Sequence, residues 1–190
     1  MRLVTFDIET IGRLVNGDLS QQEVTVVGVH DSETNEYKTF LREELKDLWP
    51  LFERADVLIG YNSDHFDIPI LNKYYSGDLT KIKSVDLLKE IRNVLGRRLK
   101  LDNVAEATLG KKKTGNGLEA IDWWAQGKVE QVKQYCLDDV RITKELYDYA
   151  KEHGSVKYTD FDGVREIKLD TSTWEVLPTR ENIMTHTLPF

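Results

Sequence analysis

One segment near the end of the chain constrains the fold more than any other, because its apolar residues recur at helical spacing as far as about His153. The stripe consists of Val129, Val132, Tyr135, Cys136, Val140, Ile142, Thr143 and Leu146. At roughly 100° per residue, Asp139 falls about 20° from the centre of the stripe, whereas Asp138 falls about 120° away, where solvated acids normally lie. A buried carboxylate costs several kcal/mol, so Asp139 needs a cation, a set of hydrogen bonds or a proton. An acid that is paired inside an ordinary core is the alternative.

A pair of carboxylates lies at the start of the chain. Residues 2 to 10 alternate as a strand does, with Phe6 and Ile8 on an apolar face and Asp7 and Glu9 on the other face. Two like charges at this spacing repel each other and raise each other's pKa unless a cation neutralises them. The pair therefore indicates a metal site or an acid–base dyad. A solvated outer face of a half-buried strand is the ordinary alternative.

The remaining pattern is that of an α/β chain. After the first strand, further strands are expected over residues 24–30, 37–41, 56–60 and 82–85, and helices over residues 42–52, 67–75, 86–95 and 104–109. A loop rich in Lys and Gly follows as far as Gly117, and Gly154 is placed to cap the last helix. The polar connection between the second and third strands suits a hairpin, so the chain is expected to begin with three antiparallel strands.

The pattern changes after the last helix. Alternating apolar residues on either side of Asp162 and Gly163 predict a β-hairpin. We therefore expect one main domain over residues 1–153 and a small C-terminal β appendage over residues 154–190, whose final part is an extended tail.

Composition and charge exclude several classes of protein. The chain has 190 residues and a formal net charge of -7, so bulk charge does not attract it to nucleic acid or to an anionic membrane. No apolar run is long enough to span a membrane, and no membrane partner is expected. The single cysteine, Cys136, permits no internal disulfide and no cysteine zinc cluster, and is expected to be a small core residue. Without a secretory apolar segment at its start, the chain is expected in the cytoplasm.

A loop in the middle of the chain supplies further candidates. Residues 60–67 read Gly-Tyr-Asn-Ser-Asp-His-Phe-Asp and connect a short strand to a helix, a place where functional residues often lie. Asp67 is as suited to capping that helix as to holding a metal ion. His65 has no second histidine at ligand spacing, so we expect a surface residue rather than a zinc ligand.

Together the chain offers four candidate metal ligands, Asp7, Glu9, Asp67 and Asp139, with no cluster of His or Cys beside them. Oxygen ligands of this kind favour Mg²⁺ or Mn²⁺ over zinc. Two divalent ions would neutralise four carboxylates. Bound cations would then attract a scissile phosphate in spite of the acidic character of the protein.

Three motifs, in this order along the chain, resemble those of a known family. They are Phe6-Asp7-Ile8-Glu9-Thr10, Tyr61-Asn62 with Phe66-Asp67, and Tyr135-Cys136-Leu137-Asp138-Asp139. They are similar to the three exonuclease motifs of the DEDD superfamily. Tyr135, four residues before Asp139, resembles the tyrosine of the DEDDy branch of 3′–5′ exonucleases, which occurs in proofreading domains of B-family DNA polymerases and in stand-alone relatives. The similarity extends to residues 84–87 and 101–110 and covers roughly residues 1–152.

The resemblance implies a ribonuclease-H-like fold, a mixed sheet with three antiparallel strands first and helices on both faces. It implies hydrolysis of phosphodiester bonds at the 3′ end of nucleic acid, with single-stranded DNA favoured over RNA, to release nucleoside monophosphates. Asp7, Glu9, Asp67 and Asp139 would hold two Mg²⁺ or Mn²⁺ ions, one generating hydroxide and the other stabilising the leaving 3′ oxygen. Tyr135, neutral at pH 7 because the reference pKa of tyrosine is about 10, would orient the attacking water.

The same resemblance implies contacts to the terminal nucleotide from Thr10, Ile11, Asn62 and Phe66, although Phe66 is equally suited to the core. A nucleic acid with a 3′ end is the expected partner, and a polymerase or a helicase is a candidate protein partner.

Two basic clusters and an aromatic pair are further candidates for contacts to nucleic acid. The clusters are Arg97-Arg98 with Lys100, and Lys111 to Lys113. They can guide a phosphate backbone, although runs of charge are usually just solvated. Trp123-Trp124 can stack on bases, although core packing of one tryptophan and partial exposure of the other is the more ordinary arrangement.

Three hypotheses about function therefore remain open at this point. The chain is a 3′–5′ exonuclease on DNA or on RNA, a non-catalytic nucleic-acid-binding module on the same fold, or a metal-free carboxylate hydrolase that acts, for example, on glycosides. Release of mononucleotides with Mg²⁺ or Mn²⁺ separates the first hypothesis from the second. Insensitivity to chelators would favour the third.

Overall fold

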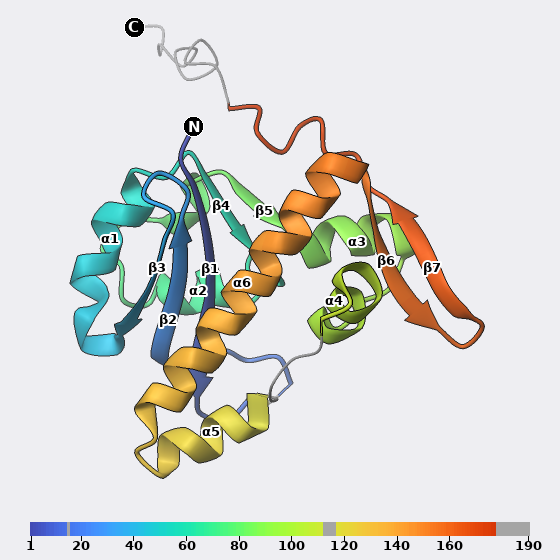
Figure 1. Ribbon diagram of the computed structural model, residues 1–190. Helices are drawn as coiled ribbons and strands as arrows, with labels where there is room; N and C mark the ends of the chain where they lie inside the picture. Colours follow the sequence, from blue (N-terminus) through green and yellow to red (C-terminus); the bar gives the residue numbers. More distant parts are fainter. Residues whose placement is uncertain (15, 112–116, 178–190) are drawn as a thin grey trace, which may run out of the picture.

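The computed structural model describes residues 1–14, 16–111 and 117–177 of the chain, and a five-stranded mixed sheet forms its centre (Figure 1). The strands are β1 (Leu3–Ile11), β2 (Glu23–Asp31), β3 (Glu36–Leu41), β4 (Val57–Gly60) and β5 (Ser84–Asp86). They lie in the order β3-β2-β1-β4-β5. β1 pairs antiparallel to β2, β2 pairs antiparallel to β3, and β4 joins β1 and β5 in parallel. The expected start with three antiparallel strands is confirmed.

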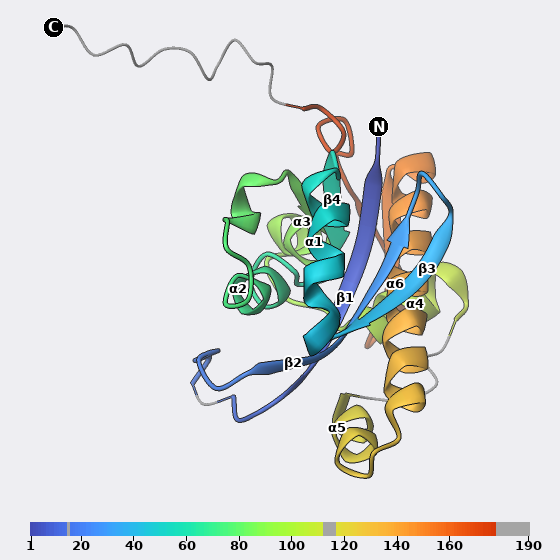
Figure 2. The ribbon, with the colours of Figure 1, turned by 90° about the vertical axis from the view of Figure 1, so that its left-hand side faces the viewer.

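Helices cover both faces of this sheet, as Figure 2 shows. They are α1 (Leu45–Glu53), α2 (Asp67–Leu71), α3 (Leu87–Leu95), α4 (Leu101–Leu109), α5 (Gly117–Ala125) and α6 (Val129–His153). α1 and α2 lie on one side of the sheet and α6 lies on the other. None of the helices in the described part of the chain is both long and apolar enough to cross a membrane.

The alternation of β1 assigns its two faces to different helices. Val4, Phe6 and Ile8 are buried in the same apolar cluster as residues of α1 and α2. Because successive side chains of a strand point to opposite faces, Asp7 and Glu9 project to the side of α6. The acidic face of the predicted strand therefore lies against α6, the helix that carries Asp139.

Gly28 of β2 allows α6 to approach the sheet closely. A Cβ atom at this position would lie 2.9 Å from the Sγ atom of Cys136 and 3.0 Å from a methyl carbon of Val140. Cys136 itself is fully buried, as expected for a small core residue. The absence of a side chain at Gly28 thus sets the distance between the helix and the strands, and with it the depth at which Asp139 lies.

The C-terminal hairpin is also confirmed. It consists of β6 (Ser155–Asp160) and β7 (Gly163–Lys168), which pair antiparallel, and it follows Gly154, whose φ of +63° ends α6. The side chain of Asn103 on α4 both donates to Thr159 O and accepts from Thr159 N, each at 2.9 Å. Buried side chains of the hairpin and of the segment after it belong to one apolar cluster with α4 and α6. A division into domains after residue 153 stays a prediction, and residues 178–190 of the expected tail lie outside the described residues.

Some predicted boundaries were wrong. The helix expected over residues 67–75 ends at Leu71, because the chain turns at Asn72, whose side chain accepts a hydrogen bond from Leu79 N at 2.9 Å. The strand expected over residues 82–85 is β5, which ends at Asp86. α4 begins three residues earlier than expected, and α5 was not predicted. α5 buries little more than Ala120 among its own residues, so its apolar period is weak.

Candidate functional site

Asp7 and Glu9 lie side by side on β1, on the face that α6 covers. One carboxylate oxygen of each residue and the Sγ atom of Cys136 all lie within 4.8 Å of one another, and both acids are partly exposed. The pairing of β1 with β2 shifts by one residue between Glu9 and Thr10. Such a bulge re-aims the side chains at a strand end, and here it follows the acidic pair directly.

α6 brings Asp139 to the same place. Its side chain is buried, with 5% of the residue exposed, although it is acidic. The pKa of Cys136 is raised well above its usual range, first by burial and then by the negative charges of Asp7, Glu9 and Asp139. Three carboxylates from β1 and α6 therefore surround one thiol, and the thiol stays protonated at neutral pH.

Asp67 is the first residue of α2, and its side chain contacts β1 along the strand edge next to β4. β4 pairs with β1 only from Leu3 to Thr5, so the edge of β1 is open beyond that point. Asp67 Oδ1 accepts a hydrogen bond from Ile8 N, the backbone between the two acids of β1, at 3.2 Å. The helix cap position is occupied by Phe66, so the alternative role of Asp67 as an N-cap is wrong.

The environment of Asp67 favours its neutral form in the metal-free protein. The residue is almost fully buried. Burial, followed by the negative charge of Asp86, raises the pKa of Asp67 to about 7. A cation nearby would reverse this effect, because an opposite charge favours the ionised carboxylate.

Tyr135 lies one helical turn before Asp139 and is held by an aromatic contact. Its ring packs edge-on against Trp123 of α5, with ring centroids 6.1 Å apart and an angle of 74°. Trp123 and Trp124 are both partly buried against the small apolar cluster of β2 and α6. The expected packing is therefore observed for both tryptophans rather than for one of them, and α5 acts as a support for Tyr135.

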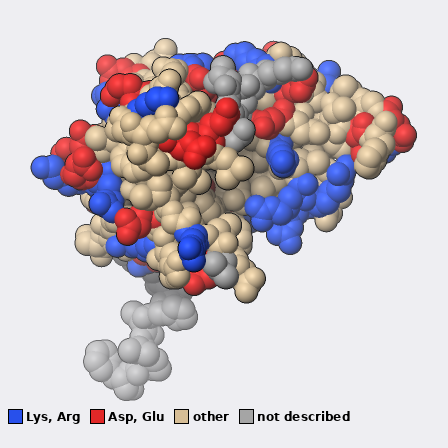
Figure 3. Space-filling model, turned by 90° about the horizontal axis from the view of Figure 1, so that it is seen from below, with Lys and Arg blue, Asp and Glu red and all other residues tan. Residues whose placement is uncertain are grey.

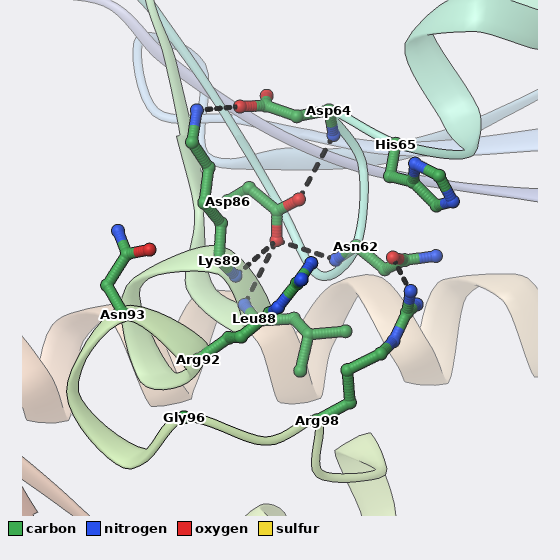
Figure 4. Close-up of a pocket in the computed structure, with 10 residues that line it drawn as sticks. All are labelled: Asn62, Asp64, His65, Asp86, Leu88, Lys89, Arg92, Asn93, Gly96 and Arg98. Carbon is green, nitrogen blue, oxygen red and sulfur yellow. Dashed lines mark hydrogen bonds and ion pairs between the residues drawn. The ribbon is translucent and has the colours of Figure 1, made fainter.

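The loop that carries Asn62 is held by Asp86, a residue that the sequence analysis did not single out. Asp86 accepts hydrogen bonds from Asn62 N at 2.7 Å and Asp64 N at 3.1 Å, and it also caps α3 (Figure 4). Burial raises the pKa of Asp86, although these N–H groups oppose that shift. Asn62 itself has a φ of +69°, a conformation that Asn adopts more readily than most residues. An Asp directly before a helical pattern is the usual signal of a cap and could have identified Asp86.

Two of the four candidate nucleotide contacts share a pocket. Asn62 and Phe66 line a largely apolar pocket of about 350 Å³ together with Leu14 and Leu19. Phe66 also packs against the core, which confirms its alternative role, whereas its contact with a nucleotide stays a prediction. Thr10 and Ile11 do not line this pocket. They lie at the end of β1, where the hydroxyl of Thr10 donates to Gln22 Oε1 at 2.8 Å.

The two arginines of the first basic cluster have different partners. Arg97 forms an ion pair with Asp160 of the hairpin at 3.1 Å, whereas Arg98 donates to Asn62 Oδ1 at 2.6 Å. Lys111 pairs with Glu145 at 2.6 Å, and the rest of its cluster, residues 112–113, lies outside the described residues. Figure 3, which views the molecule from below, shows Lys and Arg side chains gathered in a band beside clusters of Asp and Glu.

The donor atoms around β1 and α6 fit a hard divalent cation. The anionic groups beside the thiol are carboxylates, and the neutral thiol is a poor ligand. Carboxylate oxygens are the ligands preferred by Mg²⁺ and Mn²⁺. A divalent cation would also offset the repulsion between these neighbouring carboxylates.

Comparisons with known proteins agree with this geometry. Over an alignment of 192 residues, the chain is 28% identical to a DNA polymerase from Thermococcus aggregans and 27% identical to one from Thermococcus litoralis. Each alignment covers 77% of this chain but only 10% and 11% of the respective polymerase, so the chain spans about a tenth of the length of these curated relatives. The fold is similar to that of the family B DNA polymerase from the hyperthermophilic archaeon Pyrobaculum calidifontis, with a TM-score of 0.62 and 22% identity over 79% of this chain and 24% of the polymerase chain.

The family assignment comes from a wider match. The model of a family described as the RNase_H superfamily matches residues 4–151, which include most of β1, the loop with Asn62 and most of α6. This nuclease fold generally uses divalent metal ions, in agreement with the acidic cluster. The chain belongs to the RNase_H superfamily.

Proposed function

We propose that this chain is a metal-dependent 3′–5′ exonuclease that releases nucleoside monophosphates from the 3′ end of nucleic acid, with single-stranded DNA preferred over RNA. One observation carries the proposal: α6 buries the carboxylate of Asp139 beside the acidic pair of β1, although 130 residues separate Asp139 from Glu9 along the chain. The superfamily and the DNA polymerase relatives support a nucleic acid as the substrate.

In this proposal Asp7, Glu9, Asp67 and Asp139 hold two Mg²⁺ or Mn²⁺ ions. Such ions, when bound, supply a nucleophilic hydroxide and stabilise the charge that develops on the leaving oxygen. The chain contributes a rigid arrangement of donors from a strand and two helices. Asp67 is fixed by Ile8 N, and Asp139 is fixed by the close packing of α6 on Gly28.

Tyr135 has the role of orienting the attacking water in this proposal. It lies one helical turn before Asp139, so the two side chains share one face of α6. The contact with Trp123 limits the positions that its ring can adopt. A hydroxyl held in this way can accept and donate a hydrogen bond without being deprotonated.

The terminal nucleotide is proposed to occupy the apolar pocket beside Phe66. The side chains of Leu14, Leu19 and Phe66 suit the faces of a base, and the amide of Asn62 suits its polar edge. Thr10 and Ile11 are proposed to contact the sugar and phosphate through their backbone, because they follow Glu9 directly on β1.

The proposal is tested by incubating the protein with a single-stranded DNA oligonucleotide labelled at its 5′ end, in MgCl₂, MnCl₂ or EDTA. We expect a ladder of products shortened from the 3′ end, deoxynucleoside monophosphates on chromatography, and no cleavage in EDTA. A matched RNA oligonucleotide measures the preference for DNA. A wild-type protein that releases no mononucleotides with either metal would be a binding module at most, and cleavage in EDTA would favour a metal-free hydrolase.

Asp138 offers a matched control next to the central residue. Asp139→Asn is expected to lower the rate at least 100-fold, because it removes a ligand charge. Asp138→Asn makes the same chemical change one residue earlier, on a partly exposed side chain that pairs with Arg141 at 2.7 Å. It is expected to keep the rate within about twofold. Equal rates for Asp139→Asn and wild type would contradict the proposed site.

A further inference from the structure

A second pocket borders the proposed nucleotide pocket. It has a volume of about 590 Å³ and lies between the loop of Asn62, the first turns of α3 and the connection from α3 to α4 (Figure 4). Asn62, His65 and Arg98 line both pockets. The two pockets are therefore adjacent, and a linear polymer that occupies one can extend into the other.

Some charged groups of this pocket are satisfied within the protein. Lys89 forms an ion pair with Asp64, with Nζ and Oδ2 2.7 Å apart. The carboxylate of Asp86 accepts hydrogen bonds from the N–H groups of Asn62, Asp64, Leu88 and Lys89. The N-terminus of α3 is thus already capped, and these two acids and Lys89 have their partners within the protein.

The two arginines of the pocket differ from Lys89. Arg98 donates to the neutral amide oxygen of Asn62 at 2.6 Å, and Arg92 makes no hydrogen bond or ion pair through its side chain with the residues that the structure describes. In Figure 4 both side chains extend toward Asn62. Neither guanidinium is neutralised by a carboxylate of the described part of the chain.

Gly96 explains why these arginines come together. It ends α3 in a left-handed conformation with a φ of +76°, and its N–H bonds to Arg92 O. The chain therefore reverses just after α3, and Arg98 returns beside Arg92. The site is built by the turn rather than by a run of charge along one helix.

We propose that this basic pocket binds a phosphate of the nucleic-acid strand upstream of its 3′-terminal nucleotide. The inference rests on the proposed function, since it takes the apolar pocket as the place of the terminal nucleotide. The planar fork of a guanidinium matches two phosphate oxygens. Because Arg98 holds Asn62, the phosphate and the terminal nucleotide are bound by one connected group of side chains.

The inference is tested by binding, independently of cleavage. The probe is a 5′-fluorescein-labelled thymidine 12-mer, measured by anisotropy with CaCl₂ in place of the other metals and checked on a gel to be intact after each measurement. A series of probes carries one uncharged methylphosphonate linkage at each of the last four positions. The proteins are wild type, Arg92→Gln, Arg98→Gln and Arg54→Gln. Arg54 is exposed and precedes β4, at the opposite end of the strand from Asn62, so it is a matched control.

We expect wild type and Arg54→Gln to lose affinity about fivefold to tenfold when one particular linkage upstream of the last nucleotide is uncharged. Arg92→Gln and Arg98→Gln should already bind the unmodified probe about fivefold to tenfold more weakly than wild type. The uncharged linkage at this position should not lower the affinity of these two variants further. The dependence of log Kd on log salt should become shallower by about 0.7 for each lost phosphate contact. Inorganic phosphate and thymidine 5′-monophosphate should compete weakly, because the strand is the ligand.

The same loss at every linkage in wild type and both arginine variants would overturn the inference, as would tight binding of inorganic phosphate that depends on Arg92. The outcomes are separable from those of the cleavage assay. If binding depends on Arg92 but no mononucleotides are released, the proposed phosphate site is supported and the proposed exonuclease activity is contradicted. If the protein cleaves the oligonucleotide but binding depends on neither arginine, the proposed exonuclease activity is supported and the proposed phosphate site is contradicted.

Discussion

Replacement of Glu9 by glutamine is expected to stabilise the metal-free protein and to weaken its stabilisation by Mg²⁺ or Mn²⁺. Carboxylate oxygens of Glu9 and Asp7 lie within 4.8 Å of each other. At that separation two unit charges repel by about 3.5 kcal/mol at an effective dielectric constant of about 20, and by about 0.9 kcal/mol in bulk water. Both side chains are partly exposed. We therefore expect the free energy of unfolding in EDTA to increase by roughly 1–3 kcal/mol, between these limits.

Bound metal is expected to stabilise the wild type more than the Glu9→Gln variant. An ion at 100 times its dissociation constant stabilises a folded protein by about 2.7 kcal/mol. Glu9→Gln lacks one ligand charge, so it should gain much less. For a chain of this size, each kcal/mol corresponds to a shift of about 2–4 °C in Tm.

Urea unfolding followed by far-UV circular dichroism measures both effects, in EDTA, MgCl₂ and MnCl₂. Glu152→Gln is the control, because it makes the same change on an exposed residue in the last turn of α6. It should change the free energy of unfolding by less than about 0.5 kcal/mol in every buffer. A lower stability of Glu9→Gln in EDTA, or an undiminished stabilisation of this variant by metal, would refute the reasoning.

Three further predictions concern the stability of the protein. Because the pKa of Asp67 is raised to about 7 from its ordinary 3.8, this group favours the folded metal-free protein at low pH, and its contribution is lost as pH rises from about 4 to 7, by up to about 1.4 kcal/mol per pH unit. Urea unfolding in EDTA should show this decline in wild type and a smaller one in Asp67→Asn. Gly28→Ala should lower the free energy of unfolding by roughly 1–3 kcal/mol through its contact with Cys136 Sγ, and adding Cys136→Ala should recover part of the loss, as measured in the same way. Trp174→Ala should cost roughly 3–5 kcal/mol, because this buried ring stacks on Tyr147 with centroids 5.4 Å apart, and thermal unfolding should show a correspondingly lower Tm.

The burial of Asp139 was predictable because it depends on the helix alone. A residue in the middle of an apolar stripe faces the interior whatever the stripe packs against, and the structure places Asp139 there. The alternation of β1 likewise predicted that Asp7 and Glu9 share a face. The role of these residues as metal ligands stays a prediction that the assays above address.

The surroundings of Asp67 and Arg98 were not predictable from local pattern. The hydrogen bond from Ile8 N to Asp67 joins residues 59 positions apart, and it forms only because β4 leaves that edge of β1 open. The direction of Arg98 depends on the turn at Gly96 and on Asn62, which lies 36 positions away. Such contacts are decided by the packing of whole elements, which no short window of sequence contains.

The order in which the elements occur along the chain has a consequence during synthesis. β1, with Asp7 and Glu9, leaves the ribosome before α6, the helix that carries Asp139. Until that helix has emerged and docked on the sheet, the growing polypeptide lacks one of the proposed ligands. The proposed nuclease is therefore expected to be inactive toward the messenger RNA around the nascent chain until that helix has docked on the sheet.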